Sequence, residues 1–360
     1  MHKAWLILAL FLIVLPGVVV FVALNPLAPI EAASQAAETP AVPQASKGGG
    51  SGYPLVETTQ QGYDNHTPDD APILLRQAPF APFGSAEQQA WGNVQHRMVG
   101  AKEILHLTPN FKVSPGLSAE IVLTASDNPS AAEIAALPAL AKPGATAGVQ
   151  EFAVPAEREF GAVAIYDRST DVVLAIAKLE PEPVCAEIPA RYALASSPPA
   201  DAPHVCVAIN DTAALNETGS APEAVDIAAY RLSVGGAVDN PLSLTFDDLK
   251  QFPSTAEVVL LVCSGFFADN VEWTGVPLST VLEAAQAKPN YRGIRVESGS
   301  DGYYVTLDKG VIDPADVILA YQVNGEDIPL KHGYPVRLVI RDVYGSKWVK
   351  WVKDIQVLPQ

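Results

Sequence analysis

Short apolar runs separated by turn residues fill the stretch from residue 91 to residue 180. Pro, Gly and Asn stand between the runs, a pattern that is typical of short strands joined by turns. The only helical pattern lies between Ser130 and Leu140, where Ser130 can cap the first turn. We therefore predict a small, all-β, sandwich-like or barrel domain over residues 91–180. Its strands are expected at Glu103–Leu107, Glu120–Thr124, Phe152–Val154, Gly161–Tyr166 and Asp171–Ala177.

A mixed pattern covers residues 228–360. The apolar run Val258–Phe267 has the β-type composition of a buried strand, and Leu278–Ala287 is predicted to contain a helix. A further strand is expected at Trp351–Val357. We therefore predict an α+β domain here, after the all-β domain.

The chain begins with an apolar run, Ala4–Leu24, that contains no charged residue. Its length suits a helix that spans a bilayer core of about 30 Å, so we predict a transmembrane anchor over residues 1–24. A cleaved signal is the alternative, because Ala32–Ala36 resembles a cleavage site. The positive charges precede the run, which places the body of the protein outside the cytoplasm. Residues 25–90, rich in small and polar residues, are predicted to be a flexible linker and lead-in arm.

Two of the three cysteines, Cys185 and Cys206, lie in a Pro/Ala-rich connector over residues 181–227. Outside the cytosol such a pair indicates a disulfide, and two unpaired thiols are the alternative. A disulfide would leave Cys263 as the free thiol, for which metal ligation would be a reason. The alternative is that Cys263 is a small buried hydrophobic residue.

The composition excludes some classes of function. The chain has 360 residues, of which 49% are hydrophobic, enough for at least two domains. Its formal net charge of -17 argues against nucleic acid as a partner, because the phosphate backbone needs a basic surface. Three Asn-x-Thr patterns, at Asn65, Asn210 and Asn216, are interpreted only as markers of loops.

Against this acidic background, one segment near the end of the chain is basic. Arg supplies a planar fork of donors and Lys a point charge, so such a segment suits a phosphate. An ordinary solvated basic face is the alternative. One thiolate and a distant cationic loop are together what a metal held by a phosphorylated organic cofactor needs. The basic segment contains His332, Arg337, Arg341, Lys347 and Lys350.

A series of short motifs follows a fixed order over residues 228–360. The motifs are Leu232–Pro241, Leu244–Leu249, Cys263–Gly265, Trp273–Leu278, Asp301–Tyr303, Ala320–Gly325, His332–Arg337 and Tyr344–Trp351. In this order they resemble the molybdopterin-binding domain of the sulfite oxidase family.

The resemblance implies roles for these residues. Cys263 would ligate molybdenum, and Asp301 with Tyr303, or alternatively Tyr304, would face the open side of the metal as further catalytic residues. The pterin and its phosphate would be held by Cys263, Ser264, Gly265, His332, Arg337, Arg341, Gly345, Lys347 and Lys350.

The segment after the cysteine departs from the sulfite-oxidising relatives, which have Ala-Gly-Asn and arginines there. This chain has no cation in the segment and instead carries Asp269 and Glu272. We therefore expect a sulfite dianion to be held poorly. Phe266 and Phe267 would form an apolar rim or pack in the core.

The β-rich stretch has a resemblance of its own, to the DM-thirteen domain of proteins implicated in electron transfer. The residues that carry it are Asn110–Gly116, Ala119–Leu123, Asn128–Pro129, Pro155 and Ala164–Leu179. Where that family has a cysteine, this chain has Asp167. The replacement argues against electron transfer by this domain and favours a scaffold or spacer.

Together the patterns and resemblances predict a membrane-anchored, extracytoplasmic molybdopterin-dependent oxidoreductase. It would perform two-electron oxo transfer on an unknown, non-sulfite substrate, a small molecule or a peptide side chain. The chain contains no Cys-x-x-Cys-His haem motif, so we expect a separate redox protein as electron partner.

The alternative is a non-catalytic exported binding or structural protein that keeps the fold without the cofactor. Two observations favour it. Residues 1–75 contain no arginine, whereas relatives are typically exported through a twin-arginine signal, and Asp167 replaces the cysteine of the DM-thirteen domain.

Overall fold

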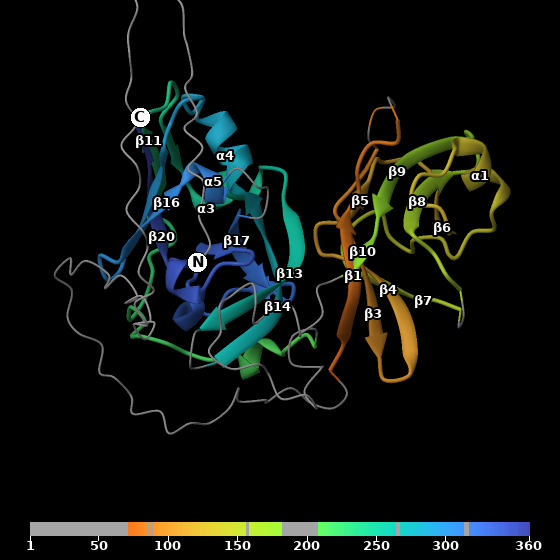
Figure 1. The fold of residues 1–360 in the computed structure, drawn as a ribbon, viewed down its shortest axis with the longest axis horizontal. Coiled ribbons are helices and arrows are strands. Elements are labelled where there is room, and N and C mark those ends of the chain that lie inside the picture. Colours follow the sequence, from red (N-terminus) through yellow and green to blue (C-terminus); the bar gives the residue numbers. More distant parts are fainter. Residues whose placement is uncertain are drawn as a thin grey trace, which may run out of the picture. The chain divides into compact units, whose positions relative to one another are not determined.

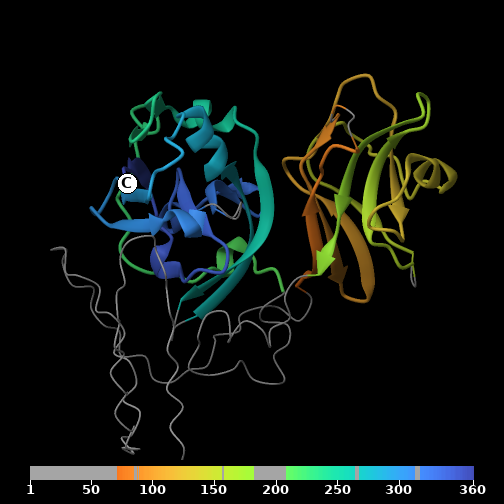
Figure 2. The ribbon, with the colours of Figure 1, turned by 45° about the horizontal axis from the view of Figure 1, so that its top comes forward.

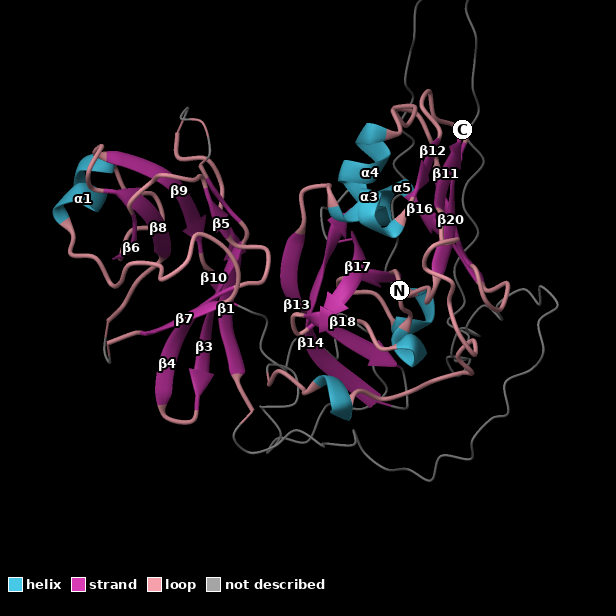
Figure 3. Ribbon diagram, turned by 180° about the vertical axis from the view of Figure 1, so that it is seen from behind, coloured by secondary structure: helices cyan, strands magenta, loops and turns pink. Residues whose placement is uncertain are grey.

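The computed structural model describes a β-rich region over residues 71–181 and a C-terminal region over residues 208–360 (Figure 1). Over these residues the protein is a mostly-β α+β structure with short helices (Figure 3). Residues inside these limits that are not described are 85, 86, 88, 156, 157, 264–266 and 313–316.

Several sequence predictions fall outside the described residues. They are the anchor at Ala4–Leu24, the pairing of Cys185 with Cys206, and the roles of Ser264 and Gly265. In the part of the chain that the structure describes, no helix is long and apolar enough to cross a membrane.

The β-rich region contains antiparallel sheets and one short helix (Figure 2, orange to yellow-green). One sheet has the strand order β10-β1-β3-β4-β7, another the order β6-β8-β9, and β2 pairs with β5. All the predicted strands are confirmed with small shifts at their ends. The elements are β1 (Ile73–Pro79), β2 (Ala90–Trp91), β3 (Asn93–Val99), β4 (Lys102–Leu107), β5 (Lys112–Val113), β6 (Ala119–Thr124), α1 (Ala131–Ala136), β7 (Gln150–Ala153), β8 (Ala162–Asp167), β9 (Val172–Lys178) and β10 (Glu180–Pro181).

Strand β8 is buried on both faces, which explains why its sequence is apolar almost throughout. Val163 and Ile165 point into the core that the two larger sheets share. Ala164 and Tyr166 point the other way, into a small cluster with Ile134 of α1. This alternation is the period of two that a strand imposes on its side chains.

The capping of α1 by Ser130 is confirmed. The Ser130 hydroxyl accepts from the backbone N–H of Glu133, and the Glu133 carboxylate accepts from Ser130 in return. The helix is shorter than predicted because Leu137 precedes Pro138, and a residue before proline disfavours the helical conformation.

The β-rich sheet begins earlier than the hydrophobic pattern indicated. Strand β1 lies in the stretch predicted to be a lead-in arm, where it pairs with β3. The pattern also missed β3, because Gln95, His96 and Arg97 are polar although all three are buried. Buried polar side chains need partners, and those of β3 find them partly in the C-terminal region.

The C-terminal region contains two sheets of five strands (Figure 1, green to blue). One has the order β12-β11-β20-β15-β16, and the other has the order β13-β14-β17-β18 with β19 also paired to β17. The elements are η1 (Thr212–Ala214), β11 (Leu232–Gly236), β12 (Leu242–Leu244), α3 (Phe246–Lys250), β13 (Thr255–Cys263), β14 (Phe267–Pro277), α4 (Leu278–Ala284), β15 (Gly293–Ser298), β16 (Tyr304–Asp308), α5 (Lys309–Ile312), β17 (Val317–Val323), β18 (Glu326–Asp327), η2 (Leu330–His332), β19 (Arg337–Ile340), η3 (Gly345–Lys347) and β20 (Val352–Leu358).

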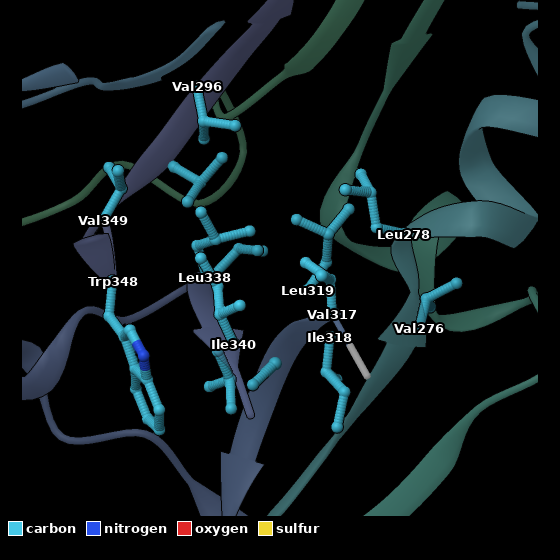
Figure 4. Packing of buried hydrophobic residues seen from close by; sticks show 14 of the residues in the cluster. Val276, Leu278, Val296, Val317, Ile318, Leu319, Leu338, Ile340, Trp348 and Val349 are labelled. Carbon is cyan, nitrogen blue, oxygen red and sulfur yellow. The ribbon is translucent and has the colours of Figure 1, made fainter. Parts of the chain in front are cut away.

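One hydrophobic core joins the two C-terminal sheets and the helices between them. Figure 4 shows Val296 of β15, Leu338 of β19 and Leu278 of α4 within this cluster. Trp273 of β14 packs edge-on against Trp348, with ring centroids 6.0 Å apart. The core therefore fixes β14 and β19, the strands beside the predicted site residues.

Candidate functional site

Cys263 is the last residue of β13 and pairs with Phe267 of β14, where the hairpin between the two strands begins. The thiol is half-buried and is not in a disulfide. Burial raises the pKa of the Cys263 thiol most, and the negative charge of Asp269 raises it further. The positive charge of Lys350 lowers it, so these two side chains, far apart in sequence, lie within electrostatic reach.

Arg337 opens β19 and is buried, with 4% of its surface exposed. Its Nη1 donates to the backbone oxygen of His332 at 2.8 Å, and the guanidinium lies 5.2 Å from the ring centroid of Trp273. Its buried Nε has no hydrogen-bond partner among the described residues. Burial lowers the pKa of Arg337 to about 10, and the charge of Asp269 opposes this effect. A buried guanidinium normally pairs with an anion, so an unused donor here points to a ligand.

His332 lies beside this arginine and is also buried. Burial lowers the pKa of His332 to about 4, and the positive charges of Arg337 and Lys350 act in the same direction. The imidazole is therefore neutral at pH 7 and offers one donor and one acceptor nitrogen.

Lys350 completes the cationic group. Its Nζ donates to the backbone oxygens of Thr218 and Lys331, both at 2.8 Å. Burial lowers the pKa of Lys350 to about 8, and the charge of Arg337 lowers it as well. The charge of Asp301 is among those that raise it. Two cations thus lie close enough to destabilise each other, an arrangement that an anion between them would relieve.

The turn between His332 and Arg337 brings these segments together. Gly333 has a φ of 118°, in the left-handed region that favours glycine. A Cβ at this position would lie 3.2 Å from the Cβ of Arg337 and 3.2 Å from the Cα of Lys350. A side chain here would therefore press on the backbone beside Lys350.

Asp269 supplies negative charge next to the thiol. Its Oδ2 accepts from the backbone N–H of Asn216 at 3.1 Å, and its Oδ1 accepts from Asn216 Nδ2 at 2.7 Å. Burial raises the pKa of Asp269, whereas the bonds from Asn216 and the charge of Arg337 lower it. The carboxylate is therefore held in one orientation by a loop that the sequence did not assign to the site.

That loop includes one of the Asn-x-Thr patterns, in which Asn216 bonds to Asp269 and Thr218 gives its backbone oxygen to Lys350. The sequence marked it correctly as a loop. No local signal could have shown that it closes on Asp269, because this contact joins residues from distant parts of the chain.

Glu272 does not share the environment of Asp269. Alternate residues of a strand face opposite sides, and these two acidic residues on β14 point in different directions. Glu272 Oε2 accepts from Gln95 Nε2 at 2.7 Å and from Arg97 Nη2 at 3.0 Å, both in the β-rich region. Of the two acidic residues that follow the cysteine, Asp269 therefore acts on the Cys263 thiol, whereas Glu272 is bound by the β-rich region.

Asp301 and Tyr303 lie in the turn between β15 and β16. Asp301 Oδ1 accepts from the backbone N–H of Tyr303 at 3.0 Å, and the Tyr303 hydroxyl donates to the backbone oxygen of Ser346. Because the charge of Asp301 acts on Lys350, this turn lies next to the cationic group.

Arg341 lies apart from this group. Its Nη2 donates to Glu257 Oε2 at 3.0 Å, and Glu257 stands near the start of β13, whereas Cys263 stands at its end. An ion pair thus accounts for the charge of Arg341.

Gly345 and Lys347 form the two ends of η3, and the Lys347 side chain is exposed. The charge interactions link Lys350, and not Lys347, to Cys263. The structure therefore brings together Cys263, His332, Arg337 and Lys350, with Asp269 and Asp301 beside them.

The chemistry of this group fits a phosphorylated pterin. Arg337, Lys350 and neutral His332 are possible donors to an anion, and the Nε of Arg337 has no hydrogen-bond partner among the described residues. Cys263 offers a soft ligand that suits a transition metal. Among the described residues, no three His, Cys, Asp or Glu side chains form a metal-binding group.

Comparisons with known proteins identify the family. The family described as "Oxidoreductase molybdopterin binding domain" matches residues 218–360. The uncharacterized oxidoreductase YuiH of Bacillus subtilis is 33% identical over 141 residues, which cover 39% of this chain and 70% of YuiH. The chain belongs to the sulfite oxidase family of molybdopterin-binding oxidoreductases. The predicted family of the C-terminal region is thereby confirmed, and members of this family bind molybdopterin.

Longer relatives match over the same part. NADH nitrate reductase of Volvox carteri is 33% identical over 171 residues, which cover 39% of this chain and 20% of the relative. Human mitochondrial sulfite oxidase is 31% identical over 165 residues, which cover 38% of this chain and 30% of the relative. The chain thus spans less than a third of the length of either protein. Among solved structures, the sulfane dehydrogenase SoxCD of Paracoccus pantotrophus is 29% identical with a TM-score of 0.40, and the match covers 42% of this chain and 44% of that one.

The family match begins at residue 218, so it includes Thr218 but not the β-rich region. The DM-thirteen resemblance of residues 91–180 therefore stays a prediction.

Proposed function

We propose that this protein is an oxidoreductase that holds molybdopterin at Cys263 and performs two-electron oxo transfer. The proposal rests on the proximity of the free Cys263 thiol to the buried guanidinium of Arg337, whose Nε has no partner in the described part of the chain. The family binds molybdopterin, and the cofactor supplies a metal centre that exchanges an oxygen atom and two electrons with a substrate.

The residues of this chain would hold the cofactor in a defined way. Arg337, with its planar fork, and Lys350 would bind the phosphate, and neutral His332 would donate to it or to the pterin. A bound dianion would raise the pKa of Lys350 from about 8 toward its ordinary value, because it would offset both burial and the charge of Arg337.

Cys263 must lose the proton on Sγ before the sulfur can bind a metal. Burial and Asp269 oppose this loss, and Lys350 favours it. Asp269 is oriented by Asn216, which keeps its negative charge near the thiol. The pairing of a poorly ionised thiol with a nearby carboxylate makes loading dependent on pH.

The charges favour a substrate other than sulfite. When a cofactor phosphate engages Arg337 and Lys350, the charged side chains left beside Cys263 include Asp269 and Asp301. Their negative charge disfavours a small dianion. A neutral or cationic small molecule, or a peptide side chain, suits this site better.

The protein acts, in this proposal, outside the cytoplasm on the end of an N-terminal membrane anchor. The apolar run Ala4–Leu24 supports the anchor. Electrons pass to a separate redox protein, because the chain has no Cys-x-x-Cys-His motif for haem.

The test is metal and pterin analysis of protein made by its native host during growth on molybdate. We expect molybdenum and pterin in equal amounts, little sulfite oxidation, and loss of pterin in Arg337→Met but not in the matched control Arg341→Met. Protein without molybdenum would refute the proposal in favour of a binding module that keeps the fold alone. Rapid sulfite oxidation by loaded protein would refute only the substrate argument.

A further inference from the structure

Strand β13, which carries Cys263, is an edge strand of its sheet. One side of an edge strand presents backbone N–H and C=O groups that no neighbouring strand pairs. When such groups are buried they need other partners, because an unsatisfied buried peptide group is costly. The β-rich region supplies several partners of β13, and Arg341 of the C-terminal region also donates to the backbone oxygen of Val258 at 3.4 Å.

The side chain of Gln77, on β1, forms with β13 the hydrogen bonds that a neighbouring strand would form. Its Oε1 accepts from the backbone N–H of Val258 at 3.0 Å, and its Nε2 donates to the backbone oxygen of Val258 at 2.9 Å. A carboxamide has the same donor and acceptor as a peptide group, so this pair copies a strand-to-strand contact. Val258 and Gln77 are both buried.

Two asparagines extend the same contact along the strand. Asn93 Oδ1 accepts from the backbone N–H of Ala256 at 3.1 Å, and Asn110 Nδ2 donates to the backbone oxygen of Ser254 at 2.7 Å. The bound residues of β13 and its approach are thus 254, 256 and 258, which share one side because a strand has a period of two.

The neighbouring strand, β14, is also bound by the β-rich region, at the residue that pairs with Val258. Val258 of β13 pairs with Glu272 of β14, and Gln77 of β1 pairs with Gln95 of β3. Gln95 and its neighbour Arg97 both donate to Glu272, and Arg97 Nε also donates to Gln95 Oε1 at 2.7 Å. The cross-strand pair Gln77 and Gln95 of the β-rich region therefore binds a cross-strand pair of the hairpin. That pair is Val258 and Glu272.

These hydrogen bonds fix the register of the hairpin formed by β13 and β14. Pairing between β13 and β14 runs without a shift from Thr255 to Cys263. A slip by one residue would turn every side chain to the other face. Cys263 would then move away from Asp269 and Lys350. The contacts at Val258 would thus control the position of a thiol that lies roughly 17 Å farther along the strand, at about 3.4 Å per residue.

We propose that the β-rich region is a built-in clamp that holds the Cys263 hairpin in register, with Gln77, Asn93, Gln95 and Arg97 as its positioning residues. The inference gives a function to the β-rich region and does not depend on the proposed oxo transfer. It rests on contacts between residues far apart in the sequence, of which Gln77 and Val258 form the most direct.

The experiment measures Cys263 in cofactor-free protein. The variant Gln77→Ala removes the two bonds to Val258. The control is Gln150→Ala in β7, because Gln150 makes the same two-bond contact with the backbone of Ala145, inside the β-rich region and away from β13. The readouts are the rate of Cys263 alkylation against pH, assigned by peptide mass spectrometry, and backbone hydrogen exchange of β13.

We expect Gln77→Ala to raise the alkylation rate of Cys263 by about tenfold, since two ordinary hydrogen bonds that oppose local opening are lost. The pH midpoint of alkylation should also fall toward that of an ordinary thiol, because an opened hairpin exposes Cys263 to water. Gln150→Ala should change neither.

A Gln77→Ala protein that matches Gln150→Ala in both readouts would overturn the clamp. If Gln77→Ala does not fold, Asn110→Ala is the second variant, which removes the bond to Ser254 together with the bonds of Asn110 to Thr108 and Asn93. Unchanged hydrogen exchange in β13 and an unchanged Cys263 midpoint in that variant would likewise overturn it.

Discussion

Arg97 and Arg337 are both buried arginines, and we predict that they respond differently to replacement by methionine. Their exposed fractions are 8% and 4%. Arg97 has a carboxylate partner, since its Nη2 lies 3.0 Å from Glu272 Oε2. Arg337 has no ion pair among the described residues, only the backbone oxygen of His332 and nearby aromatic rings.

The expected magnitudes follow from these contacts. Burial lowers the pKa of Arg337 from its ordinary value to about 10, which corresponds to an unfavourable interaction of about 3 kcal/mol at about 1.36 kcal/mol per pKa unit. Its bond to His332 stabilises by about 1.5–3 kcal/mol and the rings of Trp273 and Trp348 by roughly another 1 kcal/mol. These terms nearly cancel, so Arg337→Met should change the free energy of unfolding by no more than about 1 kcal/mol.

Arg97→Met leaves Glu272 buried without its counter-charge, and the cost of breaking such a pair is about 3–5 kcal/mol. The loss should depend on pH. Burial raises the pKa of Glu272, so its protonated form is favoured in the folded state. The full loss is therefore present above that raised pKa and shrinks as the pH falls through it.

The assay is urea unfolding of cofactor-free protein at pH 7 and at pH 5, combined with pterin content of protein from the native host. We expect Arg337→Met to unfold near the wild-type midpoint and to lack pterin. Arg97→Met should unfold earlier at pH 7 and recover partly at pH 5. If Arg337→Met cost as much as Arg97→Met, or kept its pterin, the assignment of Arg337 to a ligand would be refuted.

Four further outcomes test the site. Cys263→Ser should abolish oxo transfer and lower pterin content less than turnover, because oxygen is a harder donor than sulfur and the phosphate contacts remain; retained turnover would exclude Cys263 as the ligand. Lys350→Ala should lower pterin occupancy more than Lys347→Ala, and equal losses would contradict the charge interactions. Gly333→Ala should destabilise the protein by about 1–3 kcal/mol, because φ is 118° there, and an unchanged urea midpoint would argue against the required turn. Asp269→Asn should lower the pH midpoint of Cys263 alkylation, since its charge raises that pKa, and an unchanged midpoint would separate the two groups.

The local parts of the fold could be predicted because their causes are local. The strand at β8 and the Ser130 cap of α1 follow from apolar runs and from a capping residue that acts within one turn. The family motifs likewise placed Cys263 and Arg337 in one site before any contact was known.

The choice between Lys347 and Lys350 could not be made from the pattern. Apolar residues alternate with polar ones around Lys350, a pattern that predicts a strand with this lysine facing outward. The short helix η3 interrupts that alternation, and Trp351 has a positive φ of 52°, so the period of two does not continue. Lys350 is directed by this turn toward the backbone oxygens of Thr218 and Lys331.

The contacts of the β-rich region had no sequence signal either. Gln77 and Gln95 lie on strands with polar, buried positions, and a polar residue in a strand ordinarily indicates an exposed face. Their partners, Val258 and Glu272, lie in another region of the chain. Only the assembled structure shows that these polar side chains replace a missing strand.

A mechanical role for the β-rich region also agrees with Asp167, the residue at which the predicted DM-thirteen resemblance would place a cysteine. Asp167 is buried, with 1% of its surface exposed, and its Oδ1 accepts from the backbone N–H of Ser169 at 2.9 Å and from the Ser169 hydroxyl at 2.6 Å. These bonds order the turn between β8 and β9 and lower the pKa of Asp167. Residues 91–180 contain no cysteine, so no thiol is available there for redox chemistry. A region with an ordered turn at Asp167, and whose carboxamides bind the edge of β13, is suited to holding Cys263 in register.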